Sequence, residues 1–274
     1  MAENLIVEKR NMVAIVTLNR PEVRNAFDDV LISNLTKVFL ELERDETVHA
    51  VVLAGAGSAF CAGADLNWMK RMAGYGYEEN LKDARALAEM LKALDRMSKP
   101  TIARVHGPAY AGGVGLVAAC DIAIGSHQAE FCLTEVKLGL SPATISPYVV
   151  RAMGARLARR YFLTGEVVDA GEAYRMRLLS DISPPEELDG AINALLGHLV
   201  LGGREAHGKI KDLIRAVSAG PVDDAMIADT AKRIAEIRVS PEGREGIASF
   251  LEKRKPDWVT AFQAVRVKPP RKKK

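Results

Sequence analysis

Hydrophobic positions in the first half of the chain alternate between a strand-like and a helix-like spacing. Two β-branched runs, NLIVEKR and MVAIVTL, flank a polar turn at Asn11 and predict a hairpin. Residues 27–45 and 80–97 place apolar side chains three and four positions apart, which predicts amphipathic helices. HAVVLAG, TIARVHG and DIAIGS predict buried strands between the helical segments. This alternation is typical of an α/β fold with a largely parallel sheet.

From about residue 146 the strand pattern nearly disappears, and helical spacing continues to Phe250. We therefore predict a core domain over residues 1–200 and a helical C-terminal region over 201–262. The basic segment 263–274 is expected to be a disordered tail.

Composition narrows the class of protein. The chain has 274 residues, 48% hydrophobic and 27% charged, and its net charge of +3 is concentrated in the RKKK tail, so nucleic acid is not an expected partner. Cys61, Cys120 and Cys132 have no metal-ligand spacing, so we expect free thiols and no metal site. The N-terminus resembles no signal peptide and no window is apolar enough to span a membrane, which favours the cytoplasm.

Two turns of small residues follow predicted strands. Gly112 and Gly113 open an apolar helix, and GAGSAFCAGADLNWM at 55–69 leads toward another. Such turns can aim two backbone N–H groups at one oxygen, the arrangement that stabilises an oxyanion. Close packing of the helix against its neighbours is the other reading of the paired glycines. Phe60 occupies the third-glycine position of a dinucleotide fingerprint, and no P-loop or GxSxG elbow occurs.

These turns, with PEVRNA at 21–26 and FCLTEVKLGLSP at 131–142, resemble the crotonase, or enoyl-CoA hydratase/isomerase, family over residues 3 to about 260. The resemblance implies a β-β-α spiral with a C-terminal helical region. It also implies an acyl-CoA thioester substrate, and assembly as a homotrimer or a dimer of trimers through 201–262. The CoA and catalytic site would then lie in 1–200. No separate cofactor is expected, because coenzyme A is part of the substrate.

The resemblance assigns the two oxyanion donors to the backbone N–H groups of Ala64 and Gly112. It places the adenine end of CoA against backbone atoms around Ala62, Ala64, Asp65 and Leu66.

Three further positions resemble CoA-binding residues of the family. Arg24 matches a basic residue near the nucleotide phosphates, although it also fits an exposed loop arginine. Phe250 and Lys253 match residues that complete the CoA site, in some members from the neighbouring subunit.

Family hydratases hold water with two glutamates, and here the first of those positions is Gly115. The second is Glu135, in an apolar stretch where desolvation should raise its pKa toward a value useful for acid–base catalysis. A salt-bridged core carboxylate is the alternative reading of Glu135. Asp121 matches a structural aspartate, and no catalytic role is expected for it.

The activity expected from this resemblance is that of a lyase that adds water to an α,β-unsaturated acyl-CoA. AGADLNWMKRMA and the segment 139–166 are similar to methylglutaconyl-CoA and isohexenylglutaconyl-CoA hydratases, so a branched glutaconyl substrate and a role in leucine catabolism are expected. Lys70 and Arg71 are candidates to bind the second carboxylate of such a substrate, or are solvated helix residues.

Two other functions stay open. A Δ3,Δ2-enoyl-CoA isomerase would use Glu135 alone, without water. An RNA-binding member of the family is disfavoured, because acids outnumber the two basic residues of the matching helix and should repel phosphate. The residues are Lys37 and Arg44 against Asp28, Asp29, Glu41, Glu43, Asp45 and Glu46.

Overall fold

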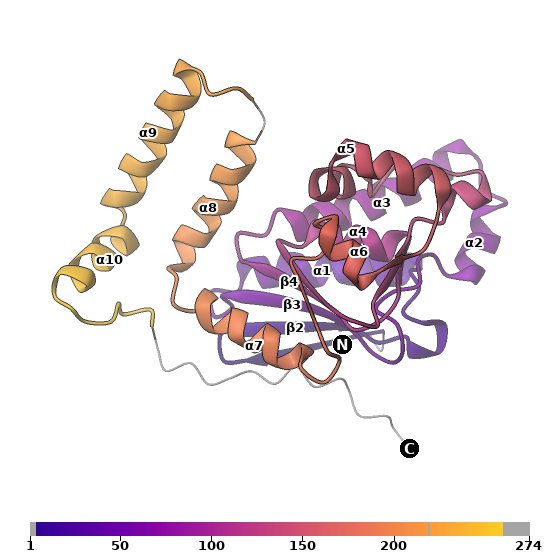
Figure 1. Ribbon diagram of the computed structural model, residues 1–274, viewed down its shortest axis with the longest axis horizontal. Coiled ribbons are helices and arrows are strands. Elements are labelled where there is room, and N and C mark those ends of the chain that lie inside the picture. The colour runs from indigo at the N-terminus through magenta and orange to yellow at the C-terminus, as the bar shows by residue number, and fades with distance from the viewer. Residues whose placement is uncertain (1–3, 219, 260–274) are drawn as a thin grey trace.

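A six-stranded sheet forms the centre of the computed structural model, which describes residues 4–218 and 220–259 (Figure 1). Its strand order is β1-β2-β3-β4-β6-β9. The strands are β1 (Leu5–Arg10), β2 (Val13–Leu18), β3 (Ala50–Gly55), β4 (Thr101–Val105), β6 (Ile122–Ser126) and β9 (Asp181–Ser183). The β1–β2 pair is antiparallel and the other pairs are parallel, which confirms the predicted hairpin and α/β fold.

A second, three-stranded sheet was not predicted. It consists of β5 (Ala109–Tyr110), β7 (Glu130–Cys132) and β8 (Val168–Asp169), in the order β5-β7-β8. These strands have two or three residues, too few for a period-two pattern to emerge from the sequence.

Helices cover both faces of the large sheet because its strands bury side chains on both sides. One face holds most of the core and the first helices, with two short 3-10 turns, η1 (Pro21–Val23) and η2 (Glu135–Leu138). These helices are α1 (Asp29–Arg44), α2 (Leu66–Met72), α3 (Tyr77–Asp95), α4 (Gly112–Ala119), α5 (Ser146–Thr164) and α6 (Ala170–Arg175). On the other face α7 (Leu188–Leu199) packs Leu188, Ile192 and Leu196 against β2, β3 and β4.

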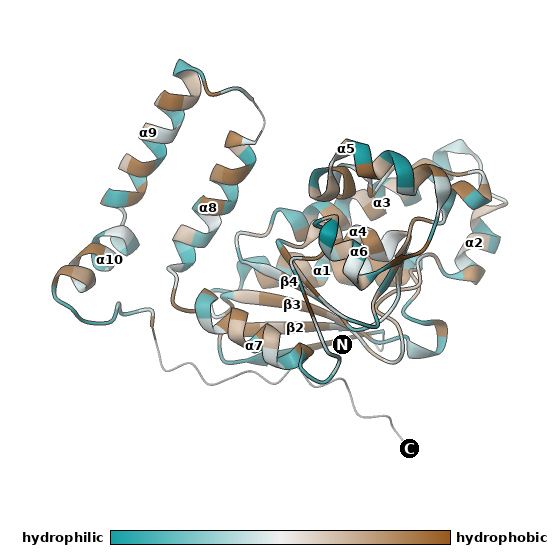
Figure 2. Ribbon diagram, in the orientation of Figure 1, coloured by the Kyte–Doolittle hydropathy of each residue, from teal (hydrophilic) through white to brown (hydrophobic). Residues whose placement is uncertain are grey.

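The last three helices form an arm that extends away from the sheet (Figure 1). They are α8 (Arg204–Val217), α9 (Asp224–Val239) and α10 (Pro241–Leu251). Hydrophobic and hydrophilic residues alternate along α8 and α9 (Figure 2), and α9 buries none of its residues. The predicted tail 263–274 lies outside the described residues.

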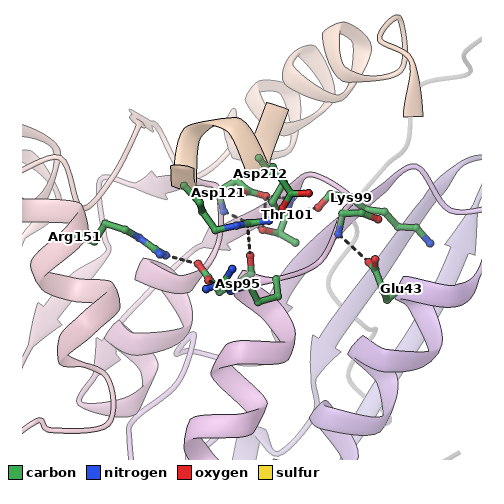
Figure 3. Close-up of polar contacts among 11 residues, drawn as sticks. Glu43, Asp95, Lys99, Thr101, Asp121, Arg151 and Asp212 are labelled. Carbon is green, nitrogen blue, oxygen red and sulfur yellow. Dashed lines mark hydrogen bonds and ion pairs between the residues drawn. The ribbon is translucent and has the colours of Figure 1, made fainter. Parts of the chain in front are cut away.

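A buried ammonium group connects the arm to the core. Lys211 on α8 is 8% exposed, and its Nζ lies 2.6 Å from Asp121 Oδ2 and 3.1 Å from the carbonyl oxygen of Lys99. The same Asp121 oxygen accepts bonds of 2.8 Å from the Thr101 amide and hydroxyl, in the surroundings drawn in Figure 3. Asp121 therefore fixes the starts of β4 and β6 and the position of α8 together.

Candidate active site

A cavity of about 660 Å³ lies where α2, α3, the start of α4 and η2 meet. We call it the main cavity. It brings together five of the residues singled out in the sequence, which are Ala62, Ala64, Leu66, Gly112 and Glu135. Segments separated by more than seventy positions in the chain therefore share one site.

The PEVRNA turn is fixed against the first small-residue turn by residues that the sequence reading did not identify. Asn25 is fully buried, and its amide nitrogen donates bonds of 2.8 Å to the carbonyl oxygens of Ala56 and Ala59. Arg20 forms ion pairs of 2.9 Å with both Asp28 and Asp65. The residue type alone does not predict the hydrogen bonds of Asn25 or the ion pairs of Arg20, because each depends on a partner elsewhere in the fold.

The N–H group of Ala64 is free to bind a ligand. Phe27 donates to the Gly63 carbonyl over 2.6 Å, and Asp65 donates to the Phe27 carbonyl over 2.7 Å. Because successive peptide groups of an extended segment face opposite sides, the intervening Ala64 N–H faces away from Phe27. Among residues 4–218 and 220–259 it has no protein acceptor, and Ala64 lines the main cavity.

The N–H group of Gly112 is similarly available at the first turn of α4. The amide of Ala111 donates to the Cys132 carbonyl over 2.8 Å, whereas no acceptor within the described part of the chain receives the Gly112 N–H. The two turns are joined directly, since Tyr110 donates to the Cys61 carbonyl over 2.8 Å. Both free donors therefore lie on turns that are bonded to each other, and both residues line the main cavity.

The paired glycines are required by packing. A Cβ at Gly112 would lie 2.7 Å from Cε2 of Phe27, and one at Gly113 would lie 2.5 Å from the Cys61 carbonyl oxygen. The structure thus supports the packing interpretation of the glycine pair. The free N–H is a consequence of the helix starting at this close contact.

The residues expected to bind the CoA nucleotide surround the same turns. The carboxylate of Asp65 caps α2, accepting from the Asn67 amide over 2.8 Å. Burial alone would raise the pKa of Asp65, but the amides of Asn67 and Trp68 and the Arg20 ion pair outweigh it and lower that pKa. Arg24 is exposed, and its carbonyl oxygen accepts from the Ala62 amide over 2.9 Å.

Glu135 is a half-buried acid at the start of η2. Burial raises its pKa, opposed in part by a hydrogen bond from its own backbone amide. Its Oε2 atom is buried and has no hydrogen-bond partner in the described structure, so Glu135 is not a salt-bridged core residue. Glu135 lines the main cavity, so its carboxyl group is a candidate to exchange protons with a ligand.

The space at the first family glutamate position is already filled. A Cβ built on Gly115 would lie 2.3 Å from Cγ2 of Ile145. Ile145 lines the main cavity, as do the polar residues Asn80, Asp83 and Thr144.

Six of the residues singled out in the sequence do not line the main cavity, and two of them, Arg24 and Asp65, lie at the turns described above. Phe250 is 82% exposed on α10 and lines a separate apolar groove with Trp258. Lys253 follows that helix. Lys70 and Arg71 do not line the main cavity, and Arg71 pairs with Asp29 over 2.5 Å.

Two other kinds of site are absent from residues 4–218 and 220–259. No helix in the described residues is long and apolar enough to cross a membrane. Within residues 4–218 and 220–259, no three His, Cys, Asp or Glu side chains cluster so as to hold a metal ion.

Comparison with known proteins places the chain among CoA enzymes. Residues 8–261 match the family model described as enoyl-CoA hydratase/isomerase. A short-chain-enoyl-CoA hydratase of Clostridium acetobutylicum is 32% identical over 254 residues, 92% of this chain and 96% of that protein.

Solved structures of similar proteins share the fold. An enoyl-CoA hydratase from Shewanella pealeana has 43% identity and a TM-score of 0.91, covering 93% of this chain and 96% of that one. Pseudomonas aeruginosa AtuE has 35% identity and a TM-score of 0.89, covering 93% and 99% of the respective chains.

Proposed function

The chain belongs to the enoyl-CoA hydratase/isomerase family, a lyase family, and we propose that it adds water to the 2,3 double bond of an acyl-CoA thioester with Glu135 as its acid–base group. One observation carries the proposal. Ala64, Gly112 and Glu135 all line the main cavity, and within residues 4–218 and 220–259 the two backbone N–H groups have no protein acceptor and Oε2 of Glu135 has no hydrogen-bond partner.

The reaction proceeds in two steps. The Glu135 carboxylate takes a proton from water while the water oxygen bonds to C3, and the electrons of the double bond move onto the thioester oxygen. The N–H groups of Ala64 and Gly112 stabilise this enolate, and removing one such donor typically costs about 10²–10³ in rate. Glu135 then gives the proton to C2. No separate cofactor is proposed, because coenzyme A is part of the thioester substrate. Ala62, Asp65, Leu66 and Arg24 would bind its nucleotide end.

Isomerisation is the alternative reaction, in which Glu135 moves a proton from C2 to C4 of a 3-enoyl thioester. It is favoured by one observation, that Ile145 fills the space beside Gly115 where a second carboxylate would stand. We favour hydration, because several relatives at this similarity carry hydratase names and the cavity has further polar side chains, at Asn80 and Thr144, to hold water.

We propose, more specifically, that the substrate is a branched glutaconyl thioester, of the kind formed in leucine catabolism. It is supported by the AGADLNWMKRMA and 139–166 segments, which are similar to glutaconyl-type hydratases. Lys137 lines the main cavity, whereas Lys70 and Arg71 do not. Lys137 is therefore the better candidate to bind the second carboxylate of a glutaconyl substrate.

We also propose that the enzyme is a trimer or a dimer of trimers in the cytoplasm. The support is the arm, whose α9 and α10 expose Ile234, Val239, Phe250 and Leu251. In such an assembly Phe250 and Lys253 would complete the CoA site of a neighbour.

The experiment that separates hydration from isomerisation uses three thioesters. We expect crotonyl-CoA, mixed with the enzyme, to lose its conjugated absorbance and yield 3-hydroxybutyryl-CoA. A gain of conjugated absorbance from 3-hexenoyl-CoA, with no loss from crotonyl-CoA or 3-methylglutaconyl-CoA, would make the enzyme an isomerase.

A further inference from the structure

A second cavity adjoins the main one. It has a volume of about 320 Å³ and lies between α1 and α3. We call it the α1–α3 groove. Ile32, Ser33, Thr36 and Ala86 line it, with Asp29, Lys37 and Glu89 as its charged residues.

Trp68 and Asp83 line both cavities and so form the wall between them. On α3 the residues Asn80, Asp83, Ala84 and Leu87 face the main cavity, a spacing that follows one side of a helix. Ala86 and Glu89 lie three and six residues beyond Asp83 and face the groove. Asp83 therefore lies at the edge shared by the two faces.

One hydrogen bond holds this wall closed. The indole nitrogen of Trp68 donates to Oδ2 of Asp83 over 3.1 Å, joining α2 to α3. Trp68 is 6% exposed and packs against the hydrophobic core, whereas Asp83 is half-buried. Helix α2 has seven residues and Trp68 is its buried residue, so the indole and its bond to Asp83 set the position of α2 against α3.

We propose that the Trp68–Asp83 pair is the movable end wall of the acyl site and sets the length of acyl group that the enzyme accepts. With the wall closed, a short acyl group fits inside the main cavity. An acyl group with a long apolar chain or branch displaces the indole and extends into the α1–α3 groove, where Ile32, Thr36 and Ala86 contact it. This inference rests on the proposed function, because it assumes that the main cavity binds the acyl group.

The test is a ratio of kcat/KM values for 2-dodecenoyl-CoA and crotonyl-CoA. Trp68→Ala joins the two cavities and should raise this ratio at least about tenfold, the scale of one methylene contact in an apolar pocket. Asp83→Ala, which leaves Trp68 in the core, should raise it less. Adding Ala86→Trp, which fills the groove, should remove the gain.

Trp258→Ala is the matched control, since the Trp258 indole also donates over 3.1 Å, to the Leu201 carbonyl in the arm. It should leave the ratio unchanged. A ratio unchanged in both Trp68→Ala and Asp83→Ala, or a gain that survives Ala86→Trp, would overturn the proposal. If the wild type hydrates neither of these thioesters nor 3-methylglutaconyl-CoA, the proposed function fails. The wall is then tested by the ratio of dodecanoyl-CoA to butyryl-CoA affinities in calorimetry, with the same outcomes expected.

Discussion

At the scale of single residues, Glu135 is the acid on which the proposed chemistry depends. Glu135→Gln keeps the size of the side chain and removes the base, so kcat should fall about 10²–10⁴-fold. Binding of a saturated acyl-CoA, measured by calorimetry, should change little, because backbone donors hold the thioester. Glu41→Gln, at an exposed position of α1, is the control and should be fully active. A loss below tenfold would assign Glu135 a structural role.

The raised pKa of Glu135 also predicts how stability depends on pH. The folded protein binds this proton more tightly than the unfolded chain, so the ionised carboxylate destabilises the fold above the raised pKa. That penalty disappears as the pH falls to 4.5, the ordinary pKa of a glutamate side chain, and below. Glu135→Gln should therefore have a larger free energy of unfolding than the wild type at pH 8, with the difference shrinking toward pH 4. Urea denaturation at both pH values measures this, and an unchanged difference would contradict it.

Gly115 shows how one neighbour decides the outcome of a substitution. Gly115→Glu would restore a two-carboxylate site only if space allowed, but a Cβ there would lie 2.3 Å from Cγ2 of Ile145. The single substitution should destabilise the fold by about 1–3 kcal/mol through overpacking and should not raise activity. Gly115→Glu combined with Ile145→Ala should recover part of the stability in thermal melts. Equal melting temperatures for the wild type and Gly115→Glu would show that Ile145 moves freely.

At the scale of elements, Lys211 determines how α8 attaches to the sheet. Lys211→Met keeps the stem but leaves Asp121 and the Lys99 carbonyl without this donor, and should cost about 1–3 kcal/mol. Amide hydrogen exchange should become faster along α8. Lys209→Met, at an exposed position of the same helix, is the control and should change neither quantity. Unchanged exchange in Lys211→Met would mean that apolar packing alone holds the helix.

At the scale of the whole molecule, the arm leaves large apolar side chains in solvent, and the proposed assembly would cover them. We expect light scattering to give three or six times the mass of the chain. Phe250→Asp places a charge in this surface and should shift the mass toward that of one chain. If Phe250 completes the CoA site of a neighbouring subunit, the KM for acyl-CoA should also rise. Leu163→Asp, also exposed but on α5, is the comparison variant. A wild-type monomer with full activity would remove the assembly from the proposal.

The sequence by itself determined the features that depend on local order. The period of apolar residues fixed the hairpin, the helices and the parallel strands, because each period places side chains on one face of its own element. The order and spacing of four motifs indicated the family, and the position of Glu135 in an apolar segment indicated its raised pKa.

Only the tertiary structure decided the contacts between distant segments. Phe27 against Gly112, Ile145 against Gly115 and the bond between Trp68 and Asp83 each join residues that no local pattern relates. Such contacts depend on side-chain volumes and on which helix faces meet, and these are set when the elements pack. For that reason the sequence indicated which groups could react, whereas the size of the cavity, its wall and the space denied to a second carboxylate followed from packing.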